Sequence, residues 1–97
     1  MGEFQELGCE VHFQVAENLS HEAFDAVVDA FISQAIEAHG LLCGGGGRNP
    51  EWNVFVTREG RGSVTAEHCQ AIESWLAARP EVNVVRIGPL VDAWYPT

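Results

Sequence analysis

Strict alternation of apolar and polar residues over positions 9–15 predicts a β-strand with one buried face. Residues 52–57 and 82–87 are short, rich in valine and carry aromatic or branched side chains, which is typical of strands, and residues 41–43 predict a shorter one. The four glycines at 44–47 are followed by Arg-Asn-Pro, a loop-like composition. The sequence therefore predicts a flexible hairpin loop between the strands at 41–43 and 52–57.

Between the first two predicted strands, the hydrophobic period changes to that of an α-helix. The apolar residues make one continuous stripe at intervals of three and four: Phe24, Val27, Val28, Phe31, Ile32, Ala35 and Ile36. Ser20 is a suitable N-cap for this helix, and Gly40 is a suitable residue after its end near His39. A second helix is predicted from the cap residue Thr65 until Pro80 stops it.

The predicted order of elements is β-α-β-β-α-β, within a chain of 97 residues that suits a single domain over 1–97. Two right-handed split βαβ halves of this length give a four-stranded antiparallel sheet with both helices on one face. This α+β arrangement is the ferredoxin-like plait. An arrangement in which the first and last segments are loops remains an alternative. The aromatic tail at 90–97 is expected to dock on the core.

Composition and charge narrow the class of protein. Apolar residues make up 46% of the chain and charged residues 20%, values that exclude a disordered chain. The net charge of −9 disfavours unaided binding to DNA, RNA or an anionic membrane. The first ten residues carry acids where a signal peptide needs bases, and no apolar run reaches the ~20 residues that cross a bilayer. A cytoplasmic location is expected.

The three cysteines, Cys9, Cys43 and Cys69, are an odd number and form no C-x-x-C pair. The sequence therefore predicts small buried hydrophobic residues in a reducing compartment rather than a disulfide framework. Cys9 and His12 fall on opposite strand faces, and His68 and Cys69 diverge by about 100° on a helix, so neither pair begins a metal site.

Catalytic motifs are missing as well. The glycine run lacks the Gly-Lys-Ser/Thr of a phosphate loop and precedes a strand rather than a helix. Capping explains Thr65 and Glu67, and His68 beside them is expected at or near the surface. Acylphosphatases share the plait, but their phosphate-binding arginine has no counterpart after the first strand. We expect a non-enzymatic protein without catalytic residues, metal or cofactor.

The outward side chains of the two central strands do not resemble an RNA-binding platform. These are Glu10, His12, Gln14, Asn53, Phe55 and Thr57, a set with one aromatic residue and no basic one. Sheets that read RNA stack bases on several aromatic side chains.

Basic residues are confined to the second half of the chain. Residues 1–47 hold eight acids and no Lys or Arg, whereas residues 48–97 hold six acids and five Arg, giving net charges of −8 and −1. The arginines beside predicted loops are Arg48, Arg58 and Arg61. Because arginine favours bidentate contacts with carboxylates and phosphates, these three are candidate partner-binding residues. Solvated loop arginines that balance the acids are the alternative.

Several segments together resemble the YggL family, small bacterial proteins described as associated with the large (50S) ribosomal subunit. The similar segments are Phe4-Gln5-Glu6-Leu7-Gly8, Val28-Asp29-x-Phe31-Ile32, Thr65-x-Glu67-His68 followed by Trp75-Leu76, and Leu90-x-Asp92-Ala93-Trp94-Tyr95. They occur in the family's order over nearly the whole chain. Most of these residues also suit a small core, so the resemblance supports the fold more directly than ribosome binding.

The chain departs from that family in one respect. Members carry a Lys/Arg-rich segment ahead of the first motif, whereas this chain has no Lys or Arg before Arg48. The sequence is either a shortened form or from a branch without the basic tail. In the second case direct RNA contact is disfavoured, and the large subunit would be reached through a basic ribosomal protein or the loop arginines.

Three hypotheses follow from these observations. The first is a ribosome-associated domain that docks through protein contacts or through Arg58 and Arg61. The second is a stand-alone interaction or regulatory domain with an acidic helix face formed by Asp25, Asp29, Gln34 and Glu37. The third is a hydrolase, which would require a phosphate-binding arginine in a loop.

Overall fold

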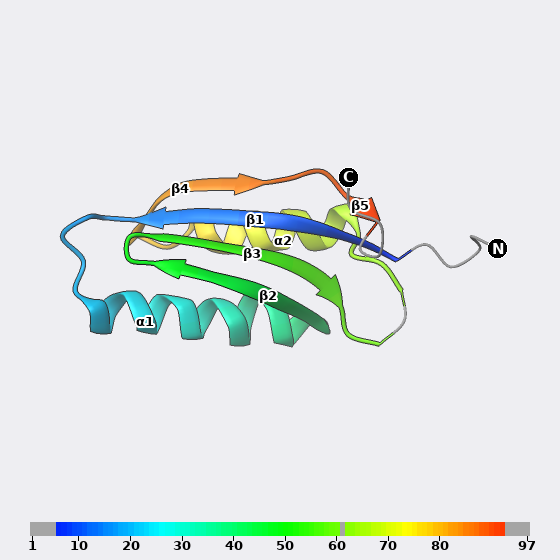
Figure 1. The fold of residues 1–97 in the computed structure, drawn as a ribbon, viewed down its shortest axis with the longest axis horizontal. Helices are drawn as coiled ribbons and strands as arrows, with labels where there is room; N and C mark the ends of the chain where they lie inside the picture. The colour runs from blue at the N-terminus through cyan, green and yellow to red at the C-terminus, as the bar shows by residue number, and fades with distance from the viewer. Residues whose placement is uncertain (1–5, 61, 93–97) are drawn as a thin grey trace.

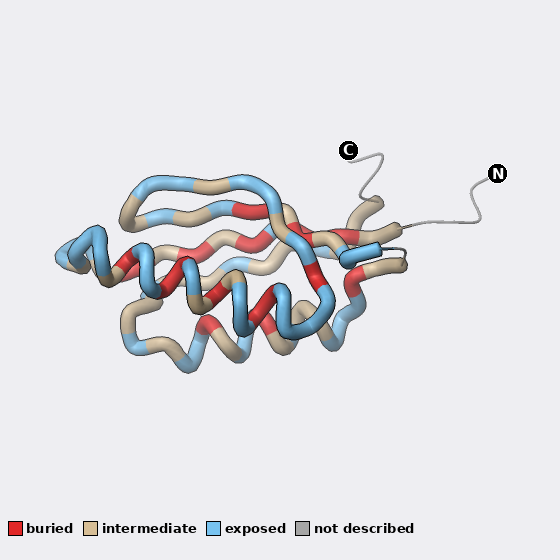
Figure 2. The backbone as a smooth tube through the Cα atoms, turned by 90° about the horizontal axis from the view of Figure 1, so that it is seen from below, coloured by how far each residue is buried: buried red, intermediate tan, exposed pale blue. Residues whose placement is uncertain are grey.

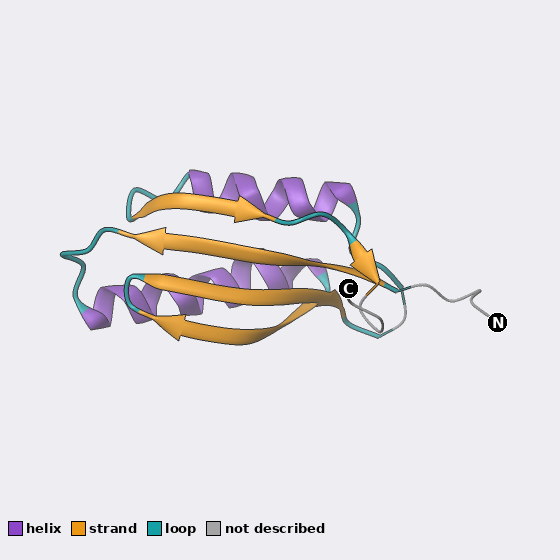
Figure 3. Cartoon of the chain, turned by 45° about the horizontal axis from the view of Figure 1, so that its top comes forward, coloured by secondary structure: helices purple, strands orange, loops and turns teal. Residues whose placement is uncertain are grey.

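The computed structural model describes residues 6–60 and 62–92 and is an α+β fold (Figure 1). Its elements are, in chain order, β1 (Leu7–Val15), α1 (His21–Ala30), the π-helical segment η1 (Phe31–Ile36), the 3-10 turn η2 (Glu37–His39), β2 (Leu41–Arg48), β3 (Glu51–Arg58), α2 (Ala66–Ala77), β4 (Val82–Ile87) and β5 (Val91–Asp92). Both helices lie on the same side of the sheet, so its other face is not covered by a helix (Figure 3).

The sheet has the order β2-β3-β1-β4, with every neighbouring pair antiparallel. A fifth strand, β5, pairs with the start of β1 through Leu7 and Gly8. The prediction of four strands is therefore wrong by one, because a two-residue strand is too short to show a hydrophobic period. The alternative with loops at 9–15 and 82–87 is also wrong, since both segments lie in strands. The tail residues 93–97 and Arg61 lie outside the described residues.

The core lies between the inner face of the sheet and the two helices. Figure 2, seen from the helix side, shows buried positions recurring along both helices and along the strands. The aromatic ring of Phe31 joins the layers: its centroid lies 5.3 Å from the ring of Phe13 on β1 and 6.0 Å from that of Trp75 on α2. The predicted helical stripe is confirmed, with most of its residues buried and Ile32 packed against the core at the edge.

The predicted ends of the first helix are confirmed. The Ser20 hydroxyl accepts a hydrogen bond from the Ala23 amide at 3.1 Å, and Gly40 has a φ of +71°, which favours glycine at a helix end. Thr65 caps α2 as predicted, but its partner is His68 rather than Glu67. The His68 Nδ1 atom accepts a hydrogen bond from the Thr65 amide at 3.0 Å, so this nitrogen is part of the helix cap.

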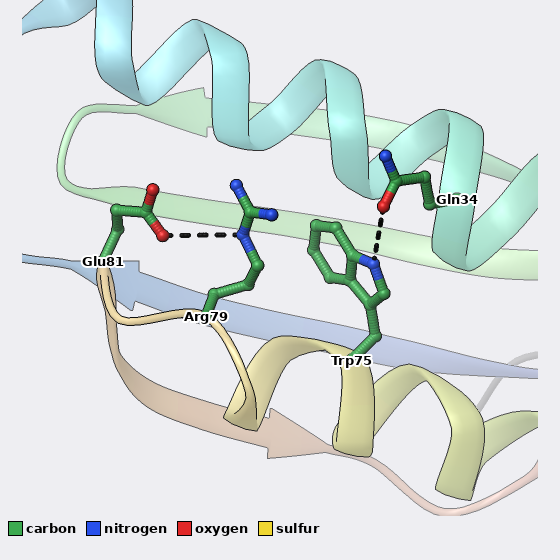
Figure 4. Close-up of polar contacts among 4 residues, drawn as sticks. All are labelled: Gln34, Trp75, Arg79 and Glu81. Atoms are coloured by element: carbon green, nitrogen blue, oxygen red, sulfur yellow. Dashed lines mark hydrogen bonds and ion pairs between the residues drawn. The ribbon is translucent and has the colours of Figure 1, made fainter.

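A small polar cluster closes the space between the helices (Figure 4). The indole Nε1 of Trp75 donates to the Gln34 Oε1 atom at 3.1 Å, which joins α2 to η1. The guanidinium of Arg79 lies 5.0 Å from the ring centroid of Trp75 and forms an ion pair with Glu81 at 3.5 Å. Arg79 therefore has a structural role and is not available as a loop cation.

The glycine run forms most of an edge strand, which corrects the prediction of a flexible loop. β2 continues through residues 44–47 to Arg48, and the hairpin turn is only Asn49 and Pro50. Because glycine has no side chain, a run of glycines shows no alternation of apolar and polar residues from which a strand could be predicted. At Gly45 the residue type is required, because its φ is +132° and a Cβ would lie 2.6 Å from the Asn53 carbonyl oxygen. Gly44 has no atom within 4 Å of the position a Cβ would take.

These two glycines provide a matched test of the edge strand. Replacing Gly45→Ala should lower the free energy of unfolding by about 1–3 kcal/mol, because the backbone is strained and the Cβ collides with β3. The control Gly44→Ala should change it by less than about 0.5 kcal/mol, as at an open surface position. Urea unfolding followed by tryptophan fluorescence measures both. Equal small effects would show that residues 44–47 behave as a loop.

Candidate partner-binding surfaces

The open face of the sheet carries a compact group of polar side chains. Strand register places Gly46, Asn53, His12 and Arg86 in one row across β2, β3, β1 and β4, and Gly44, Phe55 and Glu10 in the next. Most of these residues line one shallow, open hollow of about 600 Å³ that ends at Gly88. Because the helices lie on the opposite side, this hollow faces away from the core (Figure 3).

A hydrogen bond orients the centre of the hollow. The Nδ1 atom of His12 lies 2.6 Å from the Oδ1 atom of Asn53. An amide oxygen can only accept, so His12 Nδ1 carries the hydrogen in this pair. In the neutral imidazole, Nε2 is then an acceptor, and the Asn53 Nδ2 group provides donors. The pair presents both kinds of hydrogen-bonding group side by side.

Phe55 lies in the row next to this pair, and its ring lies over the backbone of β1 at Gly8, four residues from His12. A Cβ at Gly8 would fall 2.7 Å from Cε2 of the Phe55 ring and 2.5 Å from the Val56 carbonyl oxygen. Glycine at position 8 therefore lets the ring lie across the neighbouring strand, a known way in which aromatic side chains cover strand glycines. On the β2 side the ring's cross-strand neighbour is Gly44, which has no side chain to cover it.

The predicted loop arginines do not form one cluster. Arg48 and Arg58 are both exposed. In the strand register Arg48 lies opposite Glu51 at the start of β3, whereas Arg58 lies at the end of β3. At about 3.3 Å per residue, seven residues of strand separate the two positions by about 23 Å. Arg61 is outside the described residues. The structure thus supports two separate basic positions rather than a joint site.

Arg86 is a basic residue of the sheet face that the sequence analysis did not consider. It lies on β4 directly opposite His12, and its side chain is exposed. Residues 82–87 do not alternate strongly enough in the sequence to show which side chains face outward. Only the strand order reveals that Arg86 joins His12 and Asn53.

The four residues predicted to form an acidic helix face are all exposed, and three of them are acidic. Asp25, Asp29 and Glu37 are exposed, and no basic residue lies on α1, η1 or η2 apart from histidines. Gln34 is also exposed, but its side chain is held toward α2 by Trp75. This acidic surface is on the helix side of the molecule, opposite the hollow.

Cys9 and Cys69 meet in the structure, which their spacing in the sequence does not show. Their Sγ atoms lie 3.6 Å apart, and all three cysteines are free thiols. Burial, and secondarily the neighbouring Cys69, raises the pKa of Cys9 to about 12. Burial and the Glu37 carboxylate also raise the pKa of Cys43. Cys9 is fully buried as predicted, whereas Cys43 and Cys69 are only partly buried.

Residues 6–60 and 62–92 contain no group of three or more His, Cys, Asp and Glu side chains placed to hold a metal ion. Within the same residues, no helix is both long and apolar enough to cross a membrane.

Fold and surface together define a small α+β domain with one acidic helix face and one open, polar sheet face. Residues 1–95 match the family model described as "YggL 50S ribosome-binding protein", and the chain belongs to this family. It is 35% identical over 99 aligned residues to an uncharacterised protein of Haemophilus influenzae, an alignment that covers 100% of this chain and 85% of the relative. No solved structure matches the chain significantly.

The raised pKa of Cys9 predicts a loss of stability in alkali. The folded-state pKa of about 12 lies above the ordinary value of 9.0, so the native state holds this proton more tightly. The corresponding stabilisation is complete below pH 9 and is lost as the pH rises toward 12. Thermal midpoints measured by circular dichroism should therefore fall more steeply in this range for the wild type than for Cys9→Ala. Parallel curves for the two proteins would contradict the prediction.

Proposed function

We propose that this protein associates with the large (50S) ribosomal subunit in the cytoplasm as a non-enzymatic domain. The observation that carries the proposal is the match of residues 1–95 to a family described as 50S ribosome-binding. The resemblance noted in the sequence points the same way.

We also propose that the fold is a ferredoxin-like plait extended by one strand. The order β2-β3-β1-β4, the antiparallel pairing and the shared helix side support this assignment. The short β5 then adds to β1 at one end without changing the arrangement of the other four strands.

The distribution of charge suggests how the domain would dock. A net charge of −8 over residues 1–47 repels the phosphates that dominate the ribosome, but it complements basic ribosomal proteins. The acids Asp25 and Asp29 on α1 are exposed. The main contact in this proposal is therefore the acidic helix face against a basic ribosomal protein. Arg48, Arg58 and Arg61 are secondary contacts, and neither a membrane nor DNA is a partner.

Co-sedimentation of the chain with purified bacterial ribosomal subunits tests the association. We expect saturable binding to the large subunit that persists at physiological salt, since specific protein contacts outlast the screening of exposed charges. The small subunit is the control in the same gradient. Absence of binding to the large subunit at both low and physiological salt would refute the proposal for this chain.

Charge reversal tests which surface docks. The double variant Asp25→Lys/Asp29→Lys should weaken binding at least tenfold, because it puts like charges against a basic partner. The matched reversal Arg58→Glu/Arg61→Glu should change binding by less than threefold. The opposite ranking would show that the loop arginines form the contact. Circular dichroism of each variant verifies that the fold is retained, since Asp25, Asp29 and Arg58 are all exposed.

A further inference from the structure

We propose that the hollow on the open sheet face holds one unpaired nucleotide of the ribosomal RNA. This inference rests on the proposed association with the large subunit and adds a second contact on the other side of the molecule. It is carried by the residues that the register brings together: Phe55, His12, Asn53, Arg86 and Glu10.

Phe55 provides the surface on which a base stacks. One side of its ring lies across Gly8 of β1, and its neighbour on β2 is Gly44, where even a Cβ would meet nothing within 4 Å. Phe55 is partly exposed. A flat aromatic ring in a shallow hollow fits a planar heterocycle, since base–aromatic stacking tolerates any base.

The polar groups in the row next to Phe55 match the edge of a base. The His12–Asn53 hydrogen bond fixes both side chains, so that the His12 Nε2 acceptor and the Asn53 Nδ2 donor are preorganised. Bases are recognised in single strands through such mixed donor and acceptor patterns. The Glu10 carboxylate, next to Phe55 in the register, adds an acceptor for an amino group of the base or a ribose hydroxyl.

Arg86 supplies the charge complementarity for the phosphate. It lies opposite His12 on β4, two strands across the sheet from Phe55 on β3, and it is exposed. Guanidinium groups bind phosphate through paired hydrogen bonds. A planar platform, a polar edge and one cation within a single hollow together describe a nucleotide rather than a peptide segment.

The acidic body repels RNA phosphates and therefore limits the strength of this contact. With a net charge of −9, the chain lacks the long-range attraction that holds most RNA-binding proteins. A single-nucleotide contact is therefore weak in isolation. On the ribosome, docking through the helix face raises the effective concentration of nearby nucleotides, so a weak second contact still adds to the affinity.

Amide chemical-shift mapping by NMR tests the site without the ribosome. The probes are the four ribonucleoside monophosphates and a tetraribonucleotide of each base, added to the ¹⁵N-labelled full chain. We expect shift changes concentrated at residues 10–14, 53–55 and 86–88, and stronger binding of the tetranucleotides. No change at millimolar concentrations, or changes confined to the helix side, would overturn the proposal.

Matched variants separate stacking and phosphate binding from general effects on the fold. Phe55→Leu keeps an apolar side chain over Gly8 but removes the ring, and it should weaken tetranucleotide binding about tenfold. Arg86→Gln should weaken it several-fold, whereas Gln70→Glu, which changes the net charge by the same amount at an exposed position of α2, should have no effect. Equal effects of the two changes would indicate non-specific charge and overturn the assignment.

Photo-crosslinking on the large subunit distinguishes the failure of this inference from that of the proposed function. Thr57 faces the same side as Phe55 two residues along β3, so a benzophenone side chain placed there reports what lies over the hollow. Crosslinks to ribosomal RNA support the proposal. Crosslinks to a ribosomal protein, or co-sedimentation without any crosslink, overturn it while leaving the association intact. Absence of co-sedimentation overturns the proposed function itself.

Discussion

β1 is paired along both of its edges, and this arrangement supports the rest of the structure. β3 pairs with one edge of β1 and β4 with the other, and β5 pairs with the first residues of β1. Its four inward side chains, Cys9, Val11, Phe13 and Val15, are at most 2% exposed. Since an antiparallel pair alone is only marginally stable, the sheet depends on this central strand and on the helix stripe that packs against its inner face. Phe13 meets Phe31 in that contact, and Phe31 reaches Trp75 of the second helix.

The same alternation determines the face that the helices leave open. Every residue that β1 buries forces its neighbour outward, so Glu10, His12 and Gln14 must lie on the uncovered side. The residue at position 8 affects both the pairing of the strands and the surface of the open face. A side chain there would collide with the Phe55 ring and the Val56 carbonyl, so glycine preserves the sheet pairing and the flat surface of the hollow together. Packing and surface chemistry are thus consequences of one pattern.

Elements with a strong hydrophobic period could be predicted from the sequence, and those that depend on missing or distant side chains could not. The segment from Ser20 to Gly40 and the strand at 9–15 show clear periods. The strand occurs as expected, whereas the predicted single α-helix is α-helical only over His21–Ala30 and continues as the π-helical η1 and the 3-10 turn η2. The sequence predicts a loop at residues 44–47 because glycine contributes no hydrophobic alternation, although these residues lie in β2 and pair with β3. Arg86 was missed for a different reason. Its neighbour His12 is far away in the chain, and only the pairing of β4 with β1 makes the two adjacent.

The acidic and polar surfaces lie on opposite sides of the sheet, and this separation bears on how one small domain could meet two kinds of partner. Asp25 and Asp29 project from α1 on the helix side, whereas His12 and Arg86 lie on the open side. A helix layer packs about 10 Å from the sheet beneath it, and exposed charges are screened over about 8 Å at physiological ionic strength. The acids therefore repel RNA most strongly at their own surface, where a basic protein is the complementary partner. At the hollow, contacts of short range with the Phe55 ring, the His12–Asn53 pair and Arg86 decide what binds.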